Sequence, residues 1–417
     1  MRLTDYDLEI LGGAHGAGAA LAMRILVKTA HLLGAEELID VQSAHIDGCL
    51  YHGDGGVLFA EHLAAGAART RVSTTLNVGA LDLLHAGRER LAPRARSMAL
   101  RMTDAYVSIG CKPTWTCAPY QAGHRPQVGQ HVAWGESNAV VFCNSVLGAR
   151  TNRYGDFLDI CAAITGRAPL CGLHLDDNRL ATVLVETKDL PREWLDDEVT
   201  YPILGAWLGS HMGQEIAAFE GLGRPCEDRL KALGAAAASS GAVGLFHAIG
   251  VTPEAQTTEM AFGGRAPRRT IRLTAAMLES ARAALSTVSL SAGDPIDVVA
   301  IGSPHLSSAE LRALDDMLGE RQCAIPIYAC TGRHALHEVA TEGIEARLSA
   351  KGVVVVADTC VVVTPILPAD RGILLTNSGK FAFYTPANTG YDVVFSGLRQ
   401  CVESAVAGCY RPTGLSR

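Results

Sequence analysis

The sequence predicts an α/β protein, with multiple parallel or mixed sheets flanked by helices. Strand-like runs alternate with helical segments along most of the chain, as in folds whose parallel strands are joined by helices. Most of these runs are continuously apolar, which is typical of strands covered on both faces. A chain of 417 residues that is 48% hydrophobic and 19% charged can bury such cores and suggests two to three domains.

The first expected element is helical. Residues 5–33 carry apolar side chains at helical spacing after a cap at Thr4 or Asp5, and four glycines between 12 and 18 divide the segment into two pieces. The expected strands are 38–42, 69–76, 105–110, 182–186, 242–247, 297–302, 325–330, 353–359 and 373–377. Helices are expected between them, for example at 274–285 and 307–318.

Polar, Gly and Pro residues gather at 251–270, where we expect a linker. It would separate an N-terminal α/β region, 1–250, from a C-terminal α/β domain, 271–417. The only low-complexity stretch, 234–241, is expected to be a connector.

Composition argues against several classes of protein. The net charge of -7 and the absence of a basic run argue against a nucleic-acid partner. The first ten residues are acidic where a secretion signal needs bases, and apolar runs such as 353–357 are far shorter than the roughly 20 residues that span a bilayer. We therefore expect a soluble, cytoplasmic protein without a membrane partner.

Twelve cysteines occur without a C-x-x-C pair, so zinc ribbons and thioredoxin-like sites have no support. Most are expected to be small buried hydrophobes, because their neighbours are largely apolar. These are Cys161, Cys171, Cys323, Cys330, Cys401 and Cys409.

The most informative stretch is GESNAVVFCNSVLGARTNR, residues 135–153. In a helix, Glu136, Cys143 and Leu147 would share one face. Gly148 is expected to end the helix, and a polar loop with two arginines follows it. An acid, a thiol and amides aimed in nearby directions indicate one wall of an active site.

Polar motifs follow several of the expected strands. Ligands of open α/β sheets bind beyond the carboxyl ends of the strands, so these motifs could converge on one cleft. Each alone is more simply a turn with capping side chains, but together they favour a site. The motifs are 43–48, 73–82, 111–121, 303–308, 358–360 and 376–380.

Three cysteines, Cys117, Cys143 and Cys360, lie within or beside these motifs. Thiolates bind iron well, and three of them would leave one iron with an open coordination position. An open metal is a Lewis acid that helps a substrate hydroxyl leave as water.

Taken together, the chain resembles the catalytic large chain of the aconitase X family over residues 4–405. Seven motifs in the same order carry the resemblance: GESNAVVFCNSVLGARTNR, TCAPYQ, AHIDG, STTLN, GSPHLS, DTCVVVTP and TNSGKFAFYTP. It implies an aconitase-like fold, an iron–sulfur centre of the two-iron or four-iron type, and a hydro-lyase reaction. Family activities include dehydration of cis-3-hydroxy-L-proline in bacteria and of mevalonate 5-phosphate in archaea.

Carried over by residue, Cys117 and Cys360 match cluster positions of the family. Ser303 stands where archaeal members have a cysteine, and we expect Cys143 to supply the third ligand instead. The chain thus looks like the hydroxyproline type. The family also has a small swivelling domain with a Gly-Arg-Gly-Ser-rich loop, which is not found here. Either a separate small chain supplies this domain or this sequence omits it, and we expect a small partner subunit.

For the implied reaction, a base removes the Cα proton of a small hydroxy acid, and positive charge and donors stabilise its carboxylate. Candidate catalytic residues are Glu136, His45, Asp47 and Lys380. Candidate substrate-binding residues are Thr75, Asn77, Asn144, Ser145, Arg150, Arg153 and Ser303. Asp47 with His45, and Glu136 with His131 or His174, could pair, whereas both arginines could simply form surface salt bridges.

Two other functions stay open. Mevalonate 5-phosphate dehydratase is the alternative within the family, and residues 263–265 with Arg268 and Arg269 could hold its phosphate, although they read more naturally as a basic linker. Outside the family, the chain could be a non-catalytic iron sensor or scaffold, or a protein whose cysteines are merely core.

Overall fold

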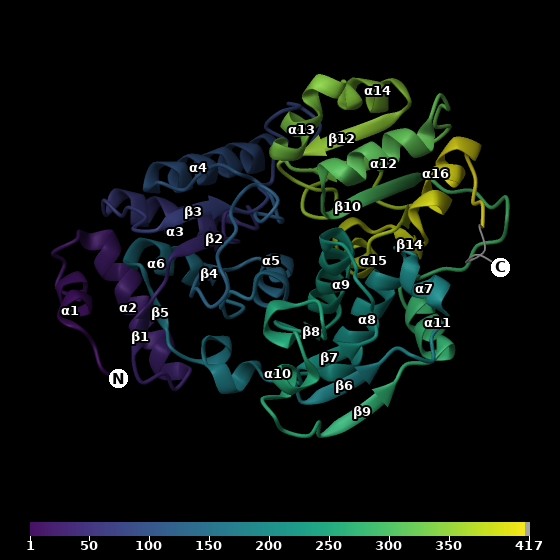
Figure 1. Cartoon of the computed structure of the whole chain (residues 1–417). Coiled ribbons are helices and arrows are strands. Elements are labelled where there is room, and N and C mark those ends of the chain that lie inside the picture. Colours follow the sequence, from purple (N-terminus) through teal and green to yellow (C-terminus); the bar gives the residue numbers. More distant parts are fainter. Residues whose placement is uncertain (413–417) are drawn as a thin grey trace. The chain divides into compact units, whose positions relative to one another are not determined.

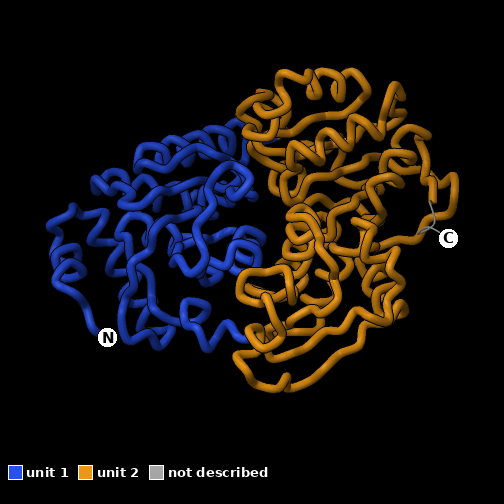
Figure 2. The backbone as a smooth tube through the Cα atoms, in the orientation of Figure 1, with its two compact units in different colours: residues 1–81, 91–180 blue, residues 82–90, 181–417 orange. Residues whose placement is uncertain are grey.

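A computed structural model describes residues 1–412 of the chain. They form two compact units (Figure 2): unit 1 comprises residues 1–81 and 91–180, and unit 2 comprises residues 82–90 together with the chain from 181 onward. Both units combine parallel sheets with helices, so the predicted α/β class is confirmed. The linker expected at 251–270, and the two domains on either side of it, stay a prediction, because this division into units does not test them.

Unit 1 begins with the two helical pieces that the sequence predicts (Figure 1). Gly18, in the second helix, cannot be replaced by a residue with a side chain, because a Cβ there would be 2.5 Å from the Leu63 carbonyl oxygen. The elements are α1 (Asp5–Leu11), α2 (Ala17–Leu32), β1 (Leu38–Asp40), β2 (Ser43–Ile46), α3 (Asp54–Ala65), β3 (Ser73–Leu76), α4 (Pro93–Ile109), β4 (Ala133–Trp134), α5 (Ser137–Phe142), η1 (Cys143–Leu147), α6 (Leu158–Thr165), β5 (Arg167–Pro169), η2 (Gly172–His174) and η3 (Asp176–Arg179).

Two small sheets organise unit 1. Strands β3, β2 and β4 pair in parallel in that order, whereas β1 and β5 pair antiparallel. Every residue of β2 is buried, which explains its mixed but non-alternating sequence. The sheet therefore presents the residues just beyond Ile46, Leu76 and Trp134 at one edge.

Unit 2 carries the rest of the chain. Its elements are β6 (Val183–Glu186), α7 (Arg192–Asp196), α8 (Thr200–Met212), β7 (Ala217–Glu220), α9 (Glu227–Ser240), β8 (His247–Ala248), η4 (Pro253–Ala255), α10 (Thr258–Phe262), β9 (Arg269–Arg272), α11 (Ala275–Ala283), β10 (Val298–Leu306), α12 (Ser308–Leu318), β11 (Ile327–Thr331), α13 (Arg333–Val339), η5 (Ala340–Glu342), α14 (Ile344–Ala350), β12 (Val353–Ala357), β13 (Ile373–Thr376), α15 (Gly379–Thr389), β14 (Asp392–Phe395) and α16 (Leu398–Ala407).

Unit 2 contains two parallel sheets. The first has five strands in the order β12-β11-β10-β13-β14, all of them parallel. Successive strands are added on one side of β10 up to β12, and then on its other side from β13, so the strand order reverses between β10 and β13. The second has four strands in the order β8-β7-β6-β9. Such reversals of strand order open a crevice at the carboxyl edge of a sheet, where α/β proteins bind ligands.

Three sequence predictions were wrong. Residues 105–110, expected as a strand, end helix α4, because Met98, Met102 and Tyr106 recur at helical spacing on its buried face. Residues 234–241, expected as a connector, belong almost wholly to α9, whose small side chains let α8 approach closely. Of the expected strand 242–247 only His247 pairs in a sheet, as the start of β8.

Candidate functional site

The stretch 135–153 begins as predicted with a helix, α5. Glu136 caps it: one carboxylate oxygen accepts the Ala139 backbone N–H at 2.6 Å, and the other accepts the Ser137 hydroxyl at 3.3 Å. The backbone then widens into one π-helical turn, η1, and ends at Gly148, which is left-handed (φ 69°) as expected. Glu136 therefore stabilises the start of α5. The sequence suggested it as a catalytic candidate and did not predict this capping role.

The loop after this helix is fixed by a residue that the sequence analysis missed. Arg179 is buried and donates to the Asn144 side-chain oxygen (3.1 Å) and to the backbone carbonyls of Asn144, Ala149 and Leu173. Asn144 also exchanges two hydrogen bonds with the backbone of Thr151. Asn144 thus builds the wall of the site, and its neighbour Ser145 is buried beside it.

The two predicted anion-binding arginines differ in exposure, because the Arg150 side chain is only 19% exposed whereas Arg153 is exposed. Arg150 pairs with the exposed carboxylate of Asp176 and donates to the His174 carbonyl at 3.3 Å. This ion pair is of the kind that the structural alternative expected, and a binding role for Arg150 stays a prediction.

His45 and Thr75 lie side by side on β2 and β3. The Thr75 hydroxyl is 2.9 Å from Nδ1 of His45 and 2.7 Å from Nδ1 of His124, which the sequence did not single out. Burial holds the pKa of His45 well below its ordinary value, and His124 lowers it further. Burial also lowers the pKa of His124 to about 4, so both rings are neutral near pH 7.

Asp47 follows β2 at the sheet edge and is half-buried. The Asn77 side-chain amide donates to its carboxylate, so two predicted residues meet. Its backbone N–H donates at 2.6 Å to Asp159, a fully buried carboxyl that the sequence analysis missed. Burial raises the pKa of Asp159 to about 7, although hydrogen bonds from the Asp47 and Ile160 backbones oppose this. The available signal was a lone acid in the apolar run LDICAAI.

His131 and His174, each suggested as a partner of Glu136, contact each other. Their Nδ1 atoms lie 2.9 Å apart, and Nε2 of His174 lies 2.7 Å from the Tyr154 hydroxyl. Burial lowers the pKa of His174 to about 3, and His131 lowers it further. The cluster is therefore a neutral hydrogen-bonded chain at physiological pH.

The candidate metal ligands are divided between the units: Cys117 and Cys143 lie in unit 1 and Cys360 in unit 2. Asn138 joins the first two segments by donating from α5 to the Cys117 carbonyl at 3.1 Å. Neither unit, over the described residues 1–412, contains by itself a group of three or more His, Cys, Asp or Glu side chains that could hold a metal ion.

The Cys143 thiol is fully buried among apolar side chains, and burial raises its pKa, although the charge of Arg179 lowers it. Its chemistry suits iron, because sulfur is the donor that iron–sulfur centres use. Its surroundings disfavour a bare thiolate, so binding would have to supply the free energy of ionisation.

In unit 2, the predicted Ser303 lies in β10, and the predicted Lys380 lies in α15, the helix that follows β13. Strands β10 and β13 flank the reversal of strand order. Ser303 lies near the end of β10, and its carbonyl accepts a hydrogen bond from Ser378, the cap of α15. Lys380 is the second residue of α15. Burial lowers the pKa of His305 to about 3, and the charge of Lys380 contributes a smaller part of that lowering. The structure thus brings the 303–308 and 376–380 motifs together.

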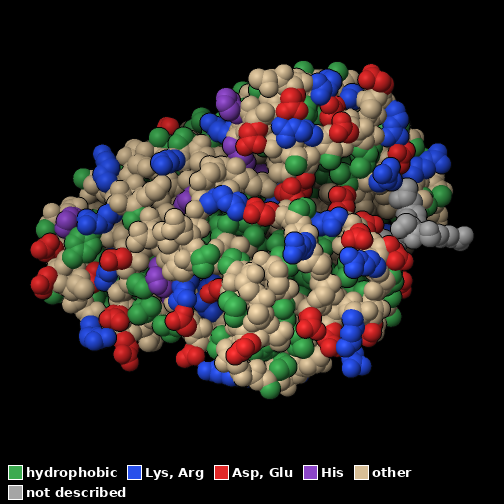
Figure 3. Space-filling view, in the orientation of Figure 1, with side chains coloured by type: hydrophobic (Ala, Val, Ile, Leu, Met, Phe, Trp, Pro, Cys, Tyr) green, Lys and Arg blue, Asp and Glu red, His purple; other side chains and the backbone are tan. Residues whose placement is uncertain are grey.

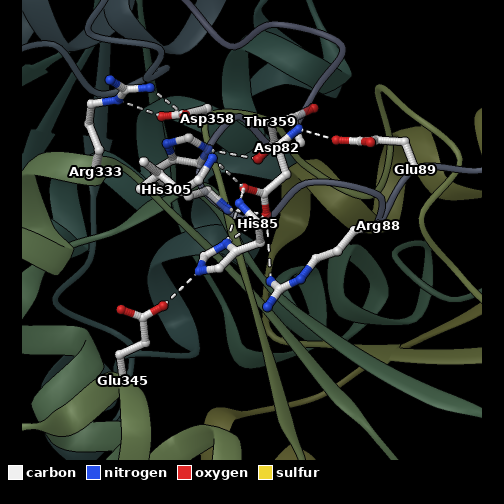
Figure 4. A network of polar contacts seen from close by, with 11 residues as sticks. Asp82, His85, Arg88, Glu89, His305, Arg333, Glu345, Asp358 and Thr359 are labelled. Carbon is white, nitrogen blue, oxygen red and sulfur yellow. Dashed lines mark hydrogen bonds and ion pairs between the residues drawn. The ribbon is translucent and has the colours of Figure 1, made fainter. Parts of the chain in front are cut away.

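Cys360 follows β12 in a loop held by a polar network (Figure 4). The fully buried Asp82 accepts the Ala357 backbone N–H at 3.1 Å and those of Leu84 and His85. Next to it, Asp358 has left-handed backbone (φ 63°) and pairs with Arg333. The segment 82–90, from the N-terminal half of the sequence, therefore shapes the Cys360 loop.

Lys and Arg side chains alternate with Asp and Glu side chains on the face drawn in Figure 3. Among the described residues, no helix has both the length and the apolar character needed to cross a membrane.

Comparisons with known proteins match this architecture along the chain. Residues 1–177 match the aconitase X first domain, residues 181–283 the second domain and residues 296–407 the third domain. The crystal structure of Thermococcus kodakaraensis aconitase X (holo-form) superimposes with a TM-score of 0.86 at 31% identity, over 97% of this chain and 100% of that one.

Curated relatives agree. A cis-3-hydroxy-L-proline dehydratase of Pseudomonas aeruginosa is 44% identical over 99% of this chain and 71% of its own length. A phosphomevalonate dehydratase large subunit of Methanothermobacter thermautotrophicus is 37% identical over 94% of this chain and 96% of its own length. The fold, three consecutive domain matches and these relatives show that the chain belongs to the aconitase X family and is a dehydratase, that is, a hydro-lyase.

Proposed function

We propose that the chain dehydrates cis-3-hydroxy-L-proline to Δ1-pyrroline-2-carboxylate. The observation that carries this proposal is the ranking of its relatives. Two proteins named cis-3-hydroxy-L-proline dehydratase are 44% and 39% identical to the chain, whereas the phosphomevalonate dehydratase large subunits are 32–37% identical. Membership of a dehydratase family also removes the support for a non-catalytic iron sensor or scaffold.

We further propose that Cys117, Cys143 and Cys360 bind an iron–sulfur centre. When bound, the centre supplies Lewis-acid assistance to the departure of the substrate hydroxyl. The thiol donors fit this group in kind, and Asn138 supports the pairing of the first two segments.

Asp47 is our proposed base for the Cα proton. It lies at the carboxyl edge of the β3-β2-β4 sheet, and Asn77 orients its carboxylate while Asp159 holds its backbone. The neutral His45 orients Thr75, which we propose as a donor to the substrate carboxylate. Glu136, by contrast, is proposed to act by fixing α5.

The remaining binding roles are proposed on weaker contacts. Lys380 supplies positive charge and Ser303 a polar edge in unit 2, while Asn144 and Ser145 line the wall after α5. Arg150 and Arg153 are proposed to attract the anionic substrate toward unit 1 from the surface.

We also propose a small partner polypeptide. The chain covers 96% or more of the large subunits from three archaea but only 71% and 69% of the two hydroxyproline dehydratases. In this proposal the uncovered third is supplied as a small swivelling domain.

A direct assay tests the substrate. Anaerobically purified chain, supplemented with the uncovered portion of the Pseudomonas relative as a separate polypeptide, is expected to turn over cis-3-hydroxy-L-proline but not mevalonate 5-phosphate. The pyrroline product is measured by reduction with a coupled dehydrogenase. Turnover of the phosphate alone would reverse the proposal in favour of the second activity.

The ligand proposal makes a separate prediction. Cys143→Ala is expected to lower the iron and sulfide content of anaerobically purified protein several-fold, because a third of the thiol donors is lost. Cys161→Ala is the matched control, since Cys161 is equally buried in unit 1 and burial also raises its pKa. Full iron content in Cys143→Ala would show that this thiol is a core residue.

A further inference from the structure

A basic cavity lies at the carboxyl ends of β6 and β7 in unit 2. Thr187 and Lys188 follow β6 directly, and residues 221–225 follow β7, the parallel neighbour of β6. Helix α7 contributes Arg192 and α9 contributes Arg229. The cavity therefore occupies the position at which parallel sheets bind ligands, and it contains none of the residues assigned to the dehydration.

The lining is strongly cationic. It includes Lys188, Arg192, Arg224 and Arg229 but a single carboxylate, Asp196. The whole chain, by contrast, has 43 acidic and 36 basic residues. Four like charges facing one space repel one another, and an anion in that space would relieve the repulsion.

Two of these cations lack a partner. Lys188 pairs with Glu186 at 2.9 Å, and Arg229 donates to the Asp196 carbonyl at 2.6 Å while lying over the Tyr201 ring. Arg192 and Arg224 form no ion pair or hydrogen bond with any residue in the described part of the chain. Their guanidinium groups are therefore available to a ligand.

Part of the cavity lining is a loop with two glycines. Gly221 and Gly223 have positive φ angles, 94° and 73°, and a Cβ on Gly221 would be 2.7 Å from the Thr187 hydroxyl. That hydroxyl donates to the Glu220 carbonyl at 2.9 Å, so the loops after β6 and β7 are held together. Glycine at position 221 therefore allows the two loops to approach closely.

We propose that this cavity binds a small phosphate-bearing anion. Guanidinium groups match the oxygen geometry of phosphate, and several cations favour a ligand with at least two negative charges. The cavity volume of about 290 Å³ suits a small metabolite. A long polyanion is disfavoured, because Asp189 and Glu193 are exposed in the same segment as Lys188 and Arg192.

Calorimetric titration of the full chain tests this proposal, with inorganic phosphate, pyrophosphate and citrate as probes at constant ionic strength. Pyrophosphate is expected to bind saturably at one site, more tightly than citrate. The double variant Arg192→Gln/Arg224→Gln is expected to bind it at least tenfold more weakly with an unchanged unfolding midpoint, since both side chains are exposed.

The control is Arg371→Gln/Arg399→Gln, which removes the same charge from exposed positions of unit 2 and should bind like the parent. Equal losses in both variants would reduce the effect to net charge and overturn the site. Absence of saturable binding, or citrate binding as tight as that of pyrophosphate, would also overturn it. Loss of binding in the cavity variant alone supports it, whatever substrate the enzyme dehydrates.

Discussion

Asp82→Ala is expected to lower the free energy of unfolding of unit 2 by about 3–5 kcal/mol, the range found when one member of a buried charged network is removed. Asp82 is fully buried and accepts hydrogen bonds from the backbones of Leu84, His85 and Ala357 and from the His85 ring (Figure 4). Alanine would leave the buried Ala357 N–H without this acceptor and would also remove the acceptor of the part-buried Leu84 and His85 donors.

Urea denaturation measures this loss, and hydrogen exchange at residues 357–360 should rise with it, because the Ala357 N–H anchors the Cys360 loop. Asp370→Ala is the control: its carboxylate is 85% exposed and pairs with Arg90, so we expect a change of at most about 1 kcal/mol. A loss for Asp82→Ala as small as that of the control would show that the network does not stabilise unit 2.

Asp159→Asn is expected to remove a pH dependence of stability. The folded state raises the pKa of Asp159 from 3.8 to about 7 because the carboxyl is buried. The folded protein therefore binds this proton more tightly than the unfolded chain does. As pH rises from about 4 to about 7, the parent loses about 1.4 kcal/mol of stability per pH unit through this group, and the loss levels off above pH 7.

The asparagine variant lacks this ionisation. Its stability relative to the parent should therefore increase between pH 5 and pH 8, as measured by urea denaturation at several pH values. Asp315→Asn is the control with the opposite sign. Burial acts to raise the pKa of Asp315, but hydrogen bonds from Arg347 and Lys351 lower it below its ordinary value of 3.8. This variant should therefore be less stable than the parent at neutral pH, and the difference should shrink as pH falls below 3.8. A parallel pH profile for Asp159→Asn and parent would mean that Asp159 ionises as in water.

Local signals predicted several elements well. The glycines between α1 and α2, the cap at Thr4 and the left-handed Gly148 all follow from the conformational preferences of single residues. The apolar runs at β10, β11 and β12 follow from burial on both faces of a parallel sheet.

Predictions from local sequence were wrong for segments that could form either of two structures, because tertiary packing determines which of the two forms. The run AYVSIG suits a strand, yet its Tyr106 and Ile109 continue the buried stripe of α4. The alanine-rich segment 234–241 looks like a connector, yet Ala236 packs near Gly205 of α8. Neither contact can be read from neighbours in sequence.

The α/β class, the family and the polar motifs at strand ends could be predicted from the amino-acid sequence, because they depend on periodicity and on short residue patterns. Which of those residues meet depends on the folded arrangement of distant segments. It gave Asp47 the supports Asn77 and Asp159, made Glu136 a helix cap, turned Arg150 toward Asp176, and placed residues 82–90 beside the Cys360 loop. The reason is that hydrogen-bond partners come from distant segments, such as Asp82 and Ala357, which are 275 positions apart, and no local pattern records such a separation.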